Sequence, residues 1–163
     1  MIEIIPNWHP TFVHFSVALL AAAAMLYVSA IVLARTSIGD LCLIVARFNL
    51  FLGAGLSFAT VAAGMYAFLT VPIDDMQRPF VIDHRNWALV TALVWWLLAL
   101  WEASRIWRSR PPQIAFVLVA VLALLPLGAT GWKGAELVYR HGVGVLPASA
   151  LSTPGGQRTV GGP

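Results

Sequence analysis

The sequence predicts an all-α integral membrane protein, a four-helix bundle that crosses the bilayer up-down-up-down. Hydrophobic residues make up 60% of the 163 residues, and charged residues only 10%. A soluble domain of this composition would lack a wettable surface. The chain also holds four apolar segments, each of at least the roughly 20 residues that a helix needs to cross a bilayer. We therefore expect lipid to surround most of the chain.

Short polar connections separate the four apolar segments and set their approximate bounds. The segments cover about 11–35, 43–71, 86–107 and 113–140. An acidic connection from Pro72 to Asp83 precedes the third segment, and Pro111 and Pro112 precede the fourth. Residues 1–146 are expected to form one transmembrane domain. Residues 147–163, rich in Gly, Pro, Ser and Thr, have too little apolar surface to fold alone, so we expect a flexible C-terminal tail.

The distribution of Lys and Arg predicts the orientation in the membrane. The N-terminal flank has neither residue type, which favours an external N-terminus, so both termini are expected on the periplasmic side of a bacterial inner membrane. No run of basic residues is present that could follow a phosphate backbone, so nucleic acid is not an expected partner. The arginines expected on the cytoplasmic side are Arg35, Arg47, Arg105, Arg108 and Arg110.

The four histidines fall at one membrane face when the chain is threaded in this way. His9 and His14 begin the first segment, His84 begins the third, and His141 ends the fourth. Ionisable residues at membrane depth are functional candidates, and imidazole is a common metal ligand. We expect His14, His84 and His141 to be direct ligands, because they head helical faces turned to the bundle. His9, which precedes Pro10, is expected to ligate a second haem or to form a hydrogen bond at the rim.

Small residues at helical spacing lie beneath these histidines and on the second segment. Two interpretations remain open: close helix packing of the small-xxx-small kind, or room for a flat macrocycle between helices. The residues are Ala18 and Ala21 on the first segment, Gly53, Ser57, Thr60 and Gly64 on the second, Ala88 and Thr91 on the third, and Gly128, Gly131 and Gly134 on the fourth.

Imidazole pairs on facing helices favour haem b, one or two copies, as the cofactor. The chain has no C-x-x-C-H pattern, so covalent c-type attachment is excluded. A Cu or Zn site built from the same histidines is the alternative, with Asp83 as a possible carboxylate ligand. The single cysteine, Cys42, is interpreted as a packing residue. Candidate partners for haem propionates are Arg85, Lys133, Tyr139 and Arg140.

Two sequence patterns and one isolated histidine resemble a bacterial membrane family known as domain of unknown function 2231. The patterns are HPTFVHF at His9–Phe15 and GAELVYRHGVGV at Gly134–Val145, and the isolated residue is His84. The chain departs from the family at Ser16, where Pro is usual, and at Glu136, where Gly is usual. The resemblance covers roughly residues 6–145. The resemblance implies a four-helix bundle whose four histidines contribute together to its function. It does not imply any particular activity.

Three functional hypotheses follow. The first is a haem b subunit that transfers electrons at the periplasmic face within a larger redox complex, with a c-type cytochrome, a dehydrogenase or quinone as partner. The second is a membrane protein that handles Cu or Zn through the same histidines. The third is a structural or assembly subunit without a cofactor. The chain contains no Ser/His/Asp set and no H-E-x-x-H pattern, so we expect no catalytic activity from this chain alone.

Overall fold

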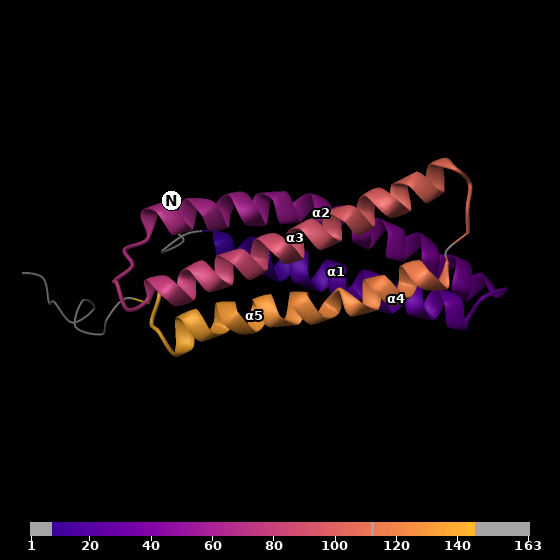
Figure 1. The fold of residues 1–163 in the computed structure, drawn as a ribbon. Coiled ribbons are helices and arrows are strands. Elements are labelled where there is room, and N and C mark those ends of the chain that lie inside the picture. Colours follow the sequence, from indigo (N-terminus) through magenta and orange to yellow (C-terminus); the bar gives the residue numbers. More distant parts are fainter. Residues whose placement is uncertain (1–7, 112, 146–163) are drawn as a thin grey trace, which may run out of the picture.

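The computed structural model describes residues 8–111 and 113–145, and all regular structure in these ranges is helical (Figure 1). The helices are α1 (His9–Val32), α2 (Ser37–Thr70), α3 (Arg78–Trp107), α4 (Ile114–Leu122) and α5 (Leu124–Tyr139). With α4 and α5 taken together, four helical stretches in the described chain are long and apolar enough to cross a membrane. The predicted all-α fold with four membrane-spanning segments is confirmed at this level. The predicted tail at 147–163 lies outside the described residues.

Two helices begin earlier than their apolar segments do. The α2 helix begins at Ser37, since the Thr36 hydroxyl accepts a hydrogen bond of 3.0 Å from the Gly39 N–H and so caps the first turn. The α3 helix begins at Arg78 and takes in part of the predicted acidic connection, because Pro79 lies in its first turn, where no N–H is needed. His84 therefore lies inside α3 and not at its start.

The fourth membrane-spanning stretch is interrupted at Ala123, between α4 and α5. Pro126 lies three residues further on. Proline lacks the N–H that would bond to the carbonyl four residues earlier, and its ring collides with that carbonyl, which breaks a helix locally. The carbonyl of Pro126 itself accepts a hydrogen bond of 3.1 Å from the Thr91 hydroxyl of α3.

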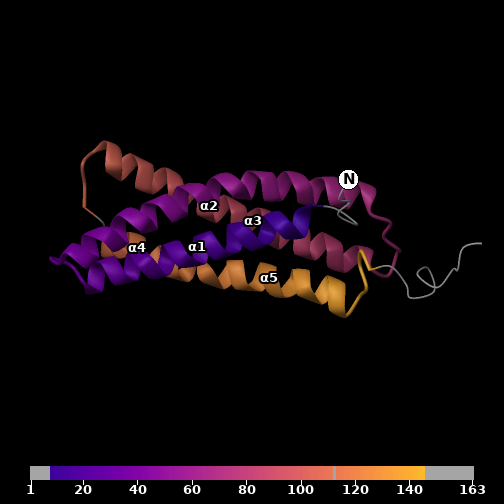
Figure 2. The ribbon, with the colours of Figure 1, turned by 180° about the vertical axis from the view of Figure 1, so that it is seen from behind.

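The helix ends gather in two groups (Figures 1 and 2). One end of the bundle, which we call the histidine end, holds the start of α1, the end of α2, the start of α3 and the end of α5. The α1–α2 and α3–α4 connections lie at the opposite end. This second end carries Arg35, Arg47, Arg105 and Arg110, and we call it the arginine end.

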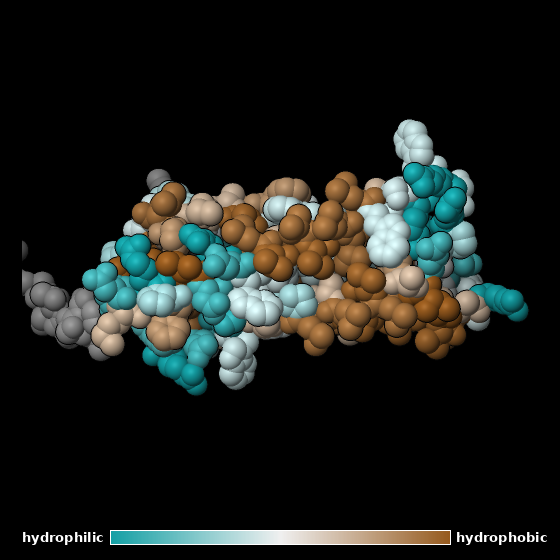
Figure 3. Space-filling view, in the orientation of Figure 1, coloured by the Kyte–Doolittle hydropathy of each residue, from teal (hydrophilic) through white to brown (hydrophobic). Residues whose placement is uncertain are grey.

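Small side chains bring the helices close together in the core. Ala23 and Ala46 are fully buried, and α1 and α2 make the most extensive helix pair. A Cβ on Gly53 of α2 would lie 2.9 Å from the Leu20 side chain, so the backbones approach closely at this point. Large apolar side chains cover much of the outside, and hydrophilic residues collect towards the two ends (Figure 3). This distribution suits a lipid environment.

Candidate functional site

Two histidine rings from different helices meet at the histidine end of the bundle. His9 is the first residue of α1, and His84 lies in the second turn of α3. Their ring centroids are 6.4 Å apart, and the ring planes are inclined at 76°. Both residues are partly buried. The structure thus brings His9, and not His14, beside His84.

A small cradle on α2 holds the His9 ring. Its Nδ1 lies 3.0 Å from the backbone carbonyl of Thr60. A carbonyl only accepts hydrogen bonds, so Nδ1 must carry the proton, and Nε2 keeps its lone pair. One turn further along α2, a Cβ on Gly64 would lie 2.8 Å from His9 Cε1, which is too close for a side chain. The hydrogen bond and the glycine together determine where the ring lies.

The His84 ring lies in a matching cradle on α5. A Cβ on Gly134 would lie 3.1 Å from His84 Cε1. The ring also interacts with the backbone carbonyl of Thr130, although its buried Nδ1 has no hydrogen bond of normal geometry. His84 therefore has the same two neighbours as His9, a threonine carbonyl and a glycine four residues later.

The two cradles share one arrangement of residues, although only the His9 ring forms a hydrogen bond with its threonine carbonyl. Each histidine is followed seven residues later by a hydroxyl side chain, Ser16 in α1 and Thr91 in α3. Ser16 forms a 2.8 Å hydrogen bond with the Thr60 hydroxyl, and Thr91 forms one of 2.8 Å with the Thr130 hydroxyl. The pairs α1–α2 and α3–α5 thus present their histidines in the same manner. The sequence carries this arrangement as a repeated pattern, His-x6-Ser/Thr followed later by Thr-x3-Gly, which helical spacing alone does not connect to the histidines.

The separation of the two ring centroids can be compared with that of two imidazoles that bind one metal from opposite sides. With a metal–nitrogen bond of about 2.0 Å and a ring centroid about 1.2 Å beyond the nitrogen, such a pair has centroids about 6.4 Å apart. The observed separation is 6.4 Å. The same bonds at a tetrahedral angle give about 5.2 Å. Moreover, no three His, Cys, Asp or Glu side chains among the described residues lie close enough to hold a metal ion. A haem takes only two ligands from the protein, a number that two histidines can supply.

The other two histidines lie outside this pair. His14 is exposed on the outer surface of α1, where its Nδ1 lies 2.5 Å from the Pro10 carbonyl of the same helix. The ring of His141 stacks on Phe80 with a centroid separation of 3.8 Å, and its Nε2 is buried without a hydrogen bond. The backbone carbonyl of His141 accepts a 2.8 Å hydrogen bond from the Gln77 side chain, which ties the end of α5 to the start of α3.

Three of the four residues predicted to meet haem propionates have other partners, and the fourth is exposed. Lys133 forms an ion pair with Asp83, the predicted carboxylate ligand, and also lies over the Trp87 ring. Arg140 pairs with Glu136 at 2.5 Å on the surface. The Arg85 guanidinium bonds to Asn86 and lies 4.8 Å from the centre of the Phe68 ring, and Tyr139 is 90% exposed.

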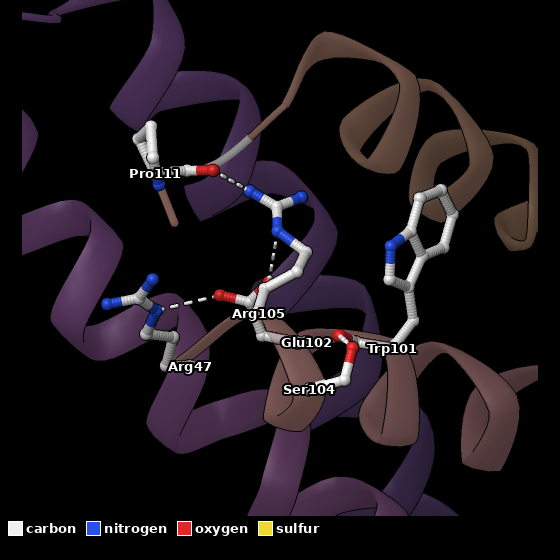
Figure 4. Close-up of polar contacts among 6 residues, drawn as sticks. All are labelled: Arg47, Trp101, Glu102, Ser104, Arg105 and Pro111. Atoms are coloured by element: carbon white, nitrogen blue, oxygen red, sulfur yellow. Dashed lines mark hydrogen bonds and ion pairs between the residues drawn. The ribbon is translucent and has the colours of Figure 1, made fainter. Parts of the chain in front are cut away.

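A second polar cluster lies at the arginine end (Figure 4). Glu102 is fully buried, and its carboxylate accepts a 2.7 Å hydrogen bond from Arg47 and faces Arg105 at 3.6 Å. Arg105 is also buried and donates to the Pro111 carbonyl. The sequence interpretation used these arginines only for orientation and assigned Glu102 no role. The signal was a carboxylate and an arginine one helical turn apart in an apolar segment.

Comparison with known proteins identifies the family but no function. No curated protein and no solved structure matches the chain. One family model, described as "Predicted membrane protein (DUF2231)", matches residues 6–147, which include every described helix. The match spans most of the 163 residues, and it agrees with the resemblance carried by the two histidine-containing patterns. The chain therefore belongs to the membrane protein family known as domain of unknown function 2231.

Proposed function

We propose that this protein is a membrane subunit that binds one haem b between His9 and His84 and transfers electrons at the periplasmic face. The 6.4 Å separation of the two rings, close to that of two opposed axial imidazoles, carries the proposal. The cradles support it. A hydrogen-bonded Nδ1 orients a ligating imidazole and makes its Nε2 more basic, and Thr60 supplies that contact to His9.

The chain's own residues would bind and tune the cofactor. A bound haem supplies a one-electron couple at its iron. The Thr60 carbonyl would hold the His9 imidazole in the ligating tautomer, and Gly64 and Gly134 leave room for the two rings. Partial burial of both histidines lowers the local dielectric, which favours the less charged state of a bound iron. Lys133, on α5, and Arg85, next to His84 on α3, would supply the positive charge for the propionates.

The proposal includes an orientation and partners. The bundle crosses a bacterial inner membrane up-down-up-down, with the histidine end in the periplasm and the arginine end in the cytoplasm. A haem near the periplasmic surface would exchange electrons with a c-type cytochrome or a dehydrogenase, or with quinone, in a larger complex. His14, exposed on α1 close to the pair, lies on the surface that such a partner would approach.

The test is an absorption spectrum of the detergent-purified protein from haem-sufficient cells, recorded oxidised and then dithionite-reduced, with metal analysis of the same sample. We expect one haem per chain with the spectrum of a six-coordinate iron. His9→Ala and His84→Ala should each remove the haem or leave it five-coordinate. His14→Ala is the matched control, because it removes a nearby exposed imidazole of the same helix, and it should keep the wild-type spectrum.

Other outcomes lead to the other hypotheses. A colourless protein that contains stoichiometric Cu or Zn, lost in His84→Ala, would replace the haem assignment by metal handling. A colourless protein without metal, in which His9→Ala leaves assembly intact, would make this chain a structural subunit. A haem that survives both substitutions would show that the ligands lie elsewhere, and His141, with its buried Nε2, would be examined next.

A further inference from the structure

We propose that a cavity at the arginine end binds the phosphate group of an anionic phospholipid. The cavity has a volume of about 670 Å³ and lies between the α1–α2 turn and the α3–α4 connection. Its size is within the range of about 300–1,000 Å³ that is usual for small-molecule sites. It lies at the opposite end of the bundle from the histidine pair, so this inference is independent of the haem proposal.

Positive charge dominates the walls of this cavity. Arg35, Arg47 and Arg110 line it, against one acidic residue, Asp40. The fully buried Glu102 does not cancel this excess, because it also faces Arg105, so two guanidinium groups share one carboxylate. A dianionic or monoanionic group in the cavity would therefore meet uncompensated positive charge.

Arg47 connects the buried cluster to the cavity. Its Nε donates to Glu102 at 2.7 Å, and its terminal nitrogens point away from that carboxylate in Figure 4. Arg47 also lines the cavity. The ion pair with Glu102 thus holds the guanidinium in place with its remaining donors directed elsewhere, and arginine donors in a rigid fork match phosphate oxygens.

Apolar walls favour a lipid over a soluble phosphate. Ile31, Leu43, Ile106 and Ile114 line the same cavity as the arginines. A small hydrophilic anion gains nothing from such walls, whereas the glycerol and first acyl carbons of a phospholipid do. The hydrophobic surface of the bundle also extends close to the hydrophilic arginine end (Figure 3), so a headgroup in the cavity leaves its acyl chains against apolar side chains. Basic pockets between membrane helices are known to take lipid headgroups.

The test compares lipids and variants on delipidated full-length protein in detergent. Native mass spectrometry and thermal unfolding are recorded with phosphatidylglycerol, with phosphatidylcholine and with inorganic phosphate. We expect retention and stabilisation by phosphatidylglycerol only. Arg110→Gln should weaken its binding about fivefold, the equivalent of the roughly 1 kcal/mol that one arginine contributes at an anionic membrane surface, and Arg110→Lys should restore most of it.

Arg108→Gln is the matched control. It removes the same charge two residues away, from an exposed side chain that does not line the cavity, and it should bind like the wild type. Equal binding of phosphatidylcholine, or equal losses in the Arg108 and Arg110 variants, would overturn the proposal, because the attraction would then be unspecific. Inorganic phosphate could instead stabilise the protein in a way that added phosphatidylglycerol does not reduce. This result would overturn the lipid assignment in favour of a soluble anion.

Discussion

Adding one methyl group at Gly64 tests the His9 cradle directly. In Gly64→Ala the new Cβ would lie 2.8 Å from His9 Cε1 and 2.9 Å from His9 Nδ1. Carbon contacts are comfortable at about 3.5–4.0 Å, so the ring must move by about 0.7 Å or more. The hydrogen bond from Nδ1 to the Thr60 carbonyl, now 3.0 Å, does not survive a displacement of this size away from α2.

The energetic consequence can be estimated against a control in the same helix. Overpacking lowers the free energy of unfolding by about 1–3 kcal/mol, and the lost hydrogen bond lowers it by about 0.5–1.5 kcal/mol. Replacing a helical glycine by alanine raises it by about 1 kcal/mol, because alanine has the higher helix propensity. Gly55→Ala receives only the propensity term, since a Cβ there has nothing within 4 Å. Both variants gain the propensity term, so Gly64→Ala should be about 1.5–4.5 kcal/mol less stable than Gly55→Ala.

The assay is unfolding of both variants in mixed detergent and dodecyl sulfate micelles, followed by tryptophan fluorescence, together with the haem content of each preparation. We expect Gly64→Ala to unfold earlier and to retain several-fold less haem. The double variant His9→Ala/Gly64→Ala should lose the penalty of the second substitution, because the colliding ring is gone. Equal stabilities of the two glycine variants, or no coupling between Gly64 and His9, would refute the reasoning.

Three further predictions concern other contacts. Thr91→Val removes the hydroxyl that bonds to Thr130 and should lower the free energy of unfolding by about 1 kcal/mol in the same micelle titration; an unchanged midpoint would contradict it. Glu102→Gln leaves two guanidinium groups without a buried counter-charge and should lower the free energy of unfolding by about 3–5 kcal/mol. Glu136→Gln, which breaks a surface ion pair, should lower it by at most about 1 kcal/mol. Similar unfolding midpoints for the two variants would contradict this prediction. Pro126→Ala should join α4 and α5 into one helix and slow amide hydrogen exchange around the break, so unchanged exchange there would speak against proline as its cause.

The number of helices and their approximate bounds could be predicted because bilayer thickness constrains sequence directly. Every spanning helix needs a long apolar run, so four runs gave four spans. The first residues of α2 and α3 could not be predicted from hydropathy. Thr36 and Pro79 extend those helices through local capping and first-turn geometry, which hydropathy does not report.

The location of the histidines towards one end of the bundle could also be predicted from the threading of the chain, but not which histidines meet. His9 and His14 are five residues apart, so they point in directions about 140° apart on a helix of 3.6 residues per turn. Only the rotation of α1 against α2 decides which of them faces the bundle. That rotation follows from the packing of Leu20 against Gly53 and from the bond between Ser16 and Thr60.

By itself, the sequence determined a four-span helical membrane protein with its histidines towards one end and a group of five arginines, Arg35, Arg47, Arg105, Arg108 and Arg110, towards the other, because these properties depend on composition and on order along the chain. Only the tertiary structure decided that His9 pairs with His84, that two equivalent threonine–glycine cradles hold them, and that Glu102 lies buried between two arginines. These contacts join residues 46 to 75 positions apart in the sequence, apart from the Glu102–Arg105 pair within α3. They depend on how far each helix is rotated about its axis and shifted along it relative to its neighbours. The fit of side chains across the core determines that rotation and that shift.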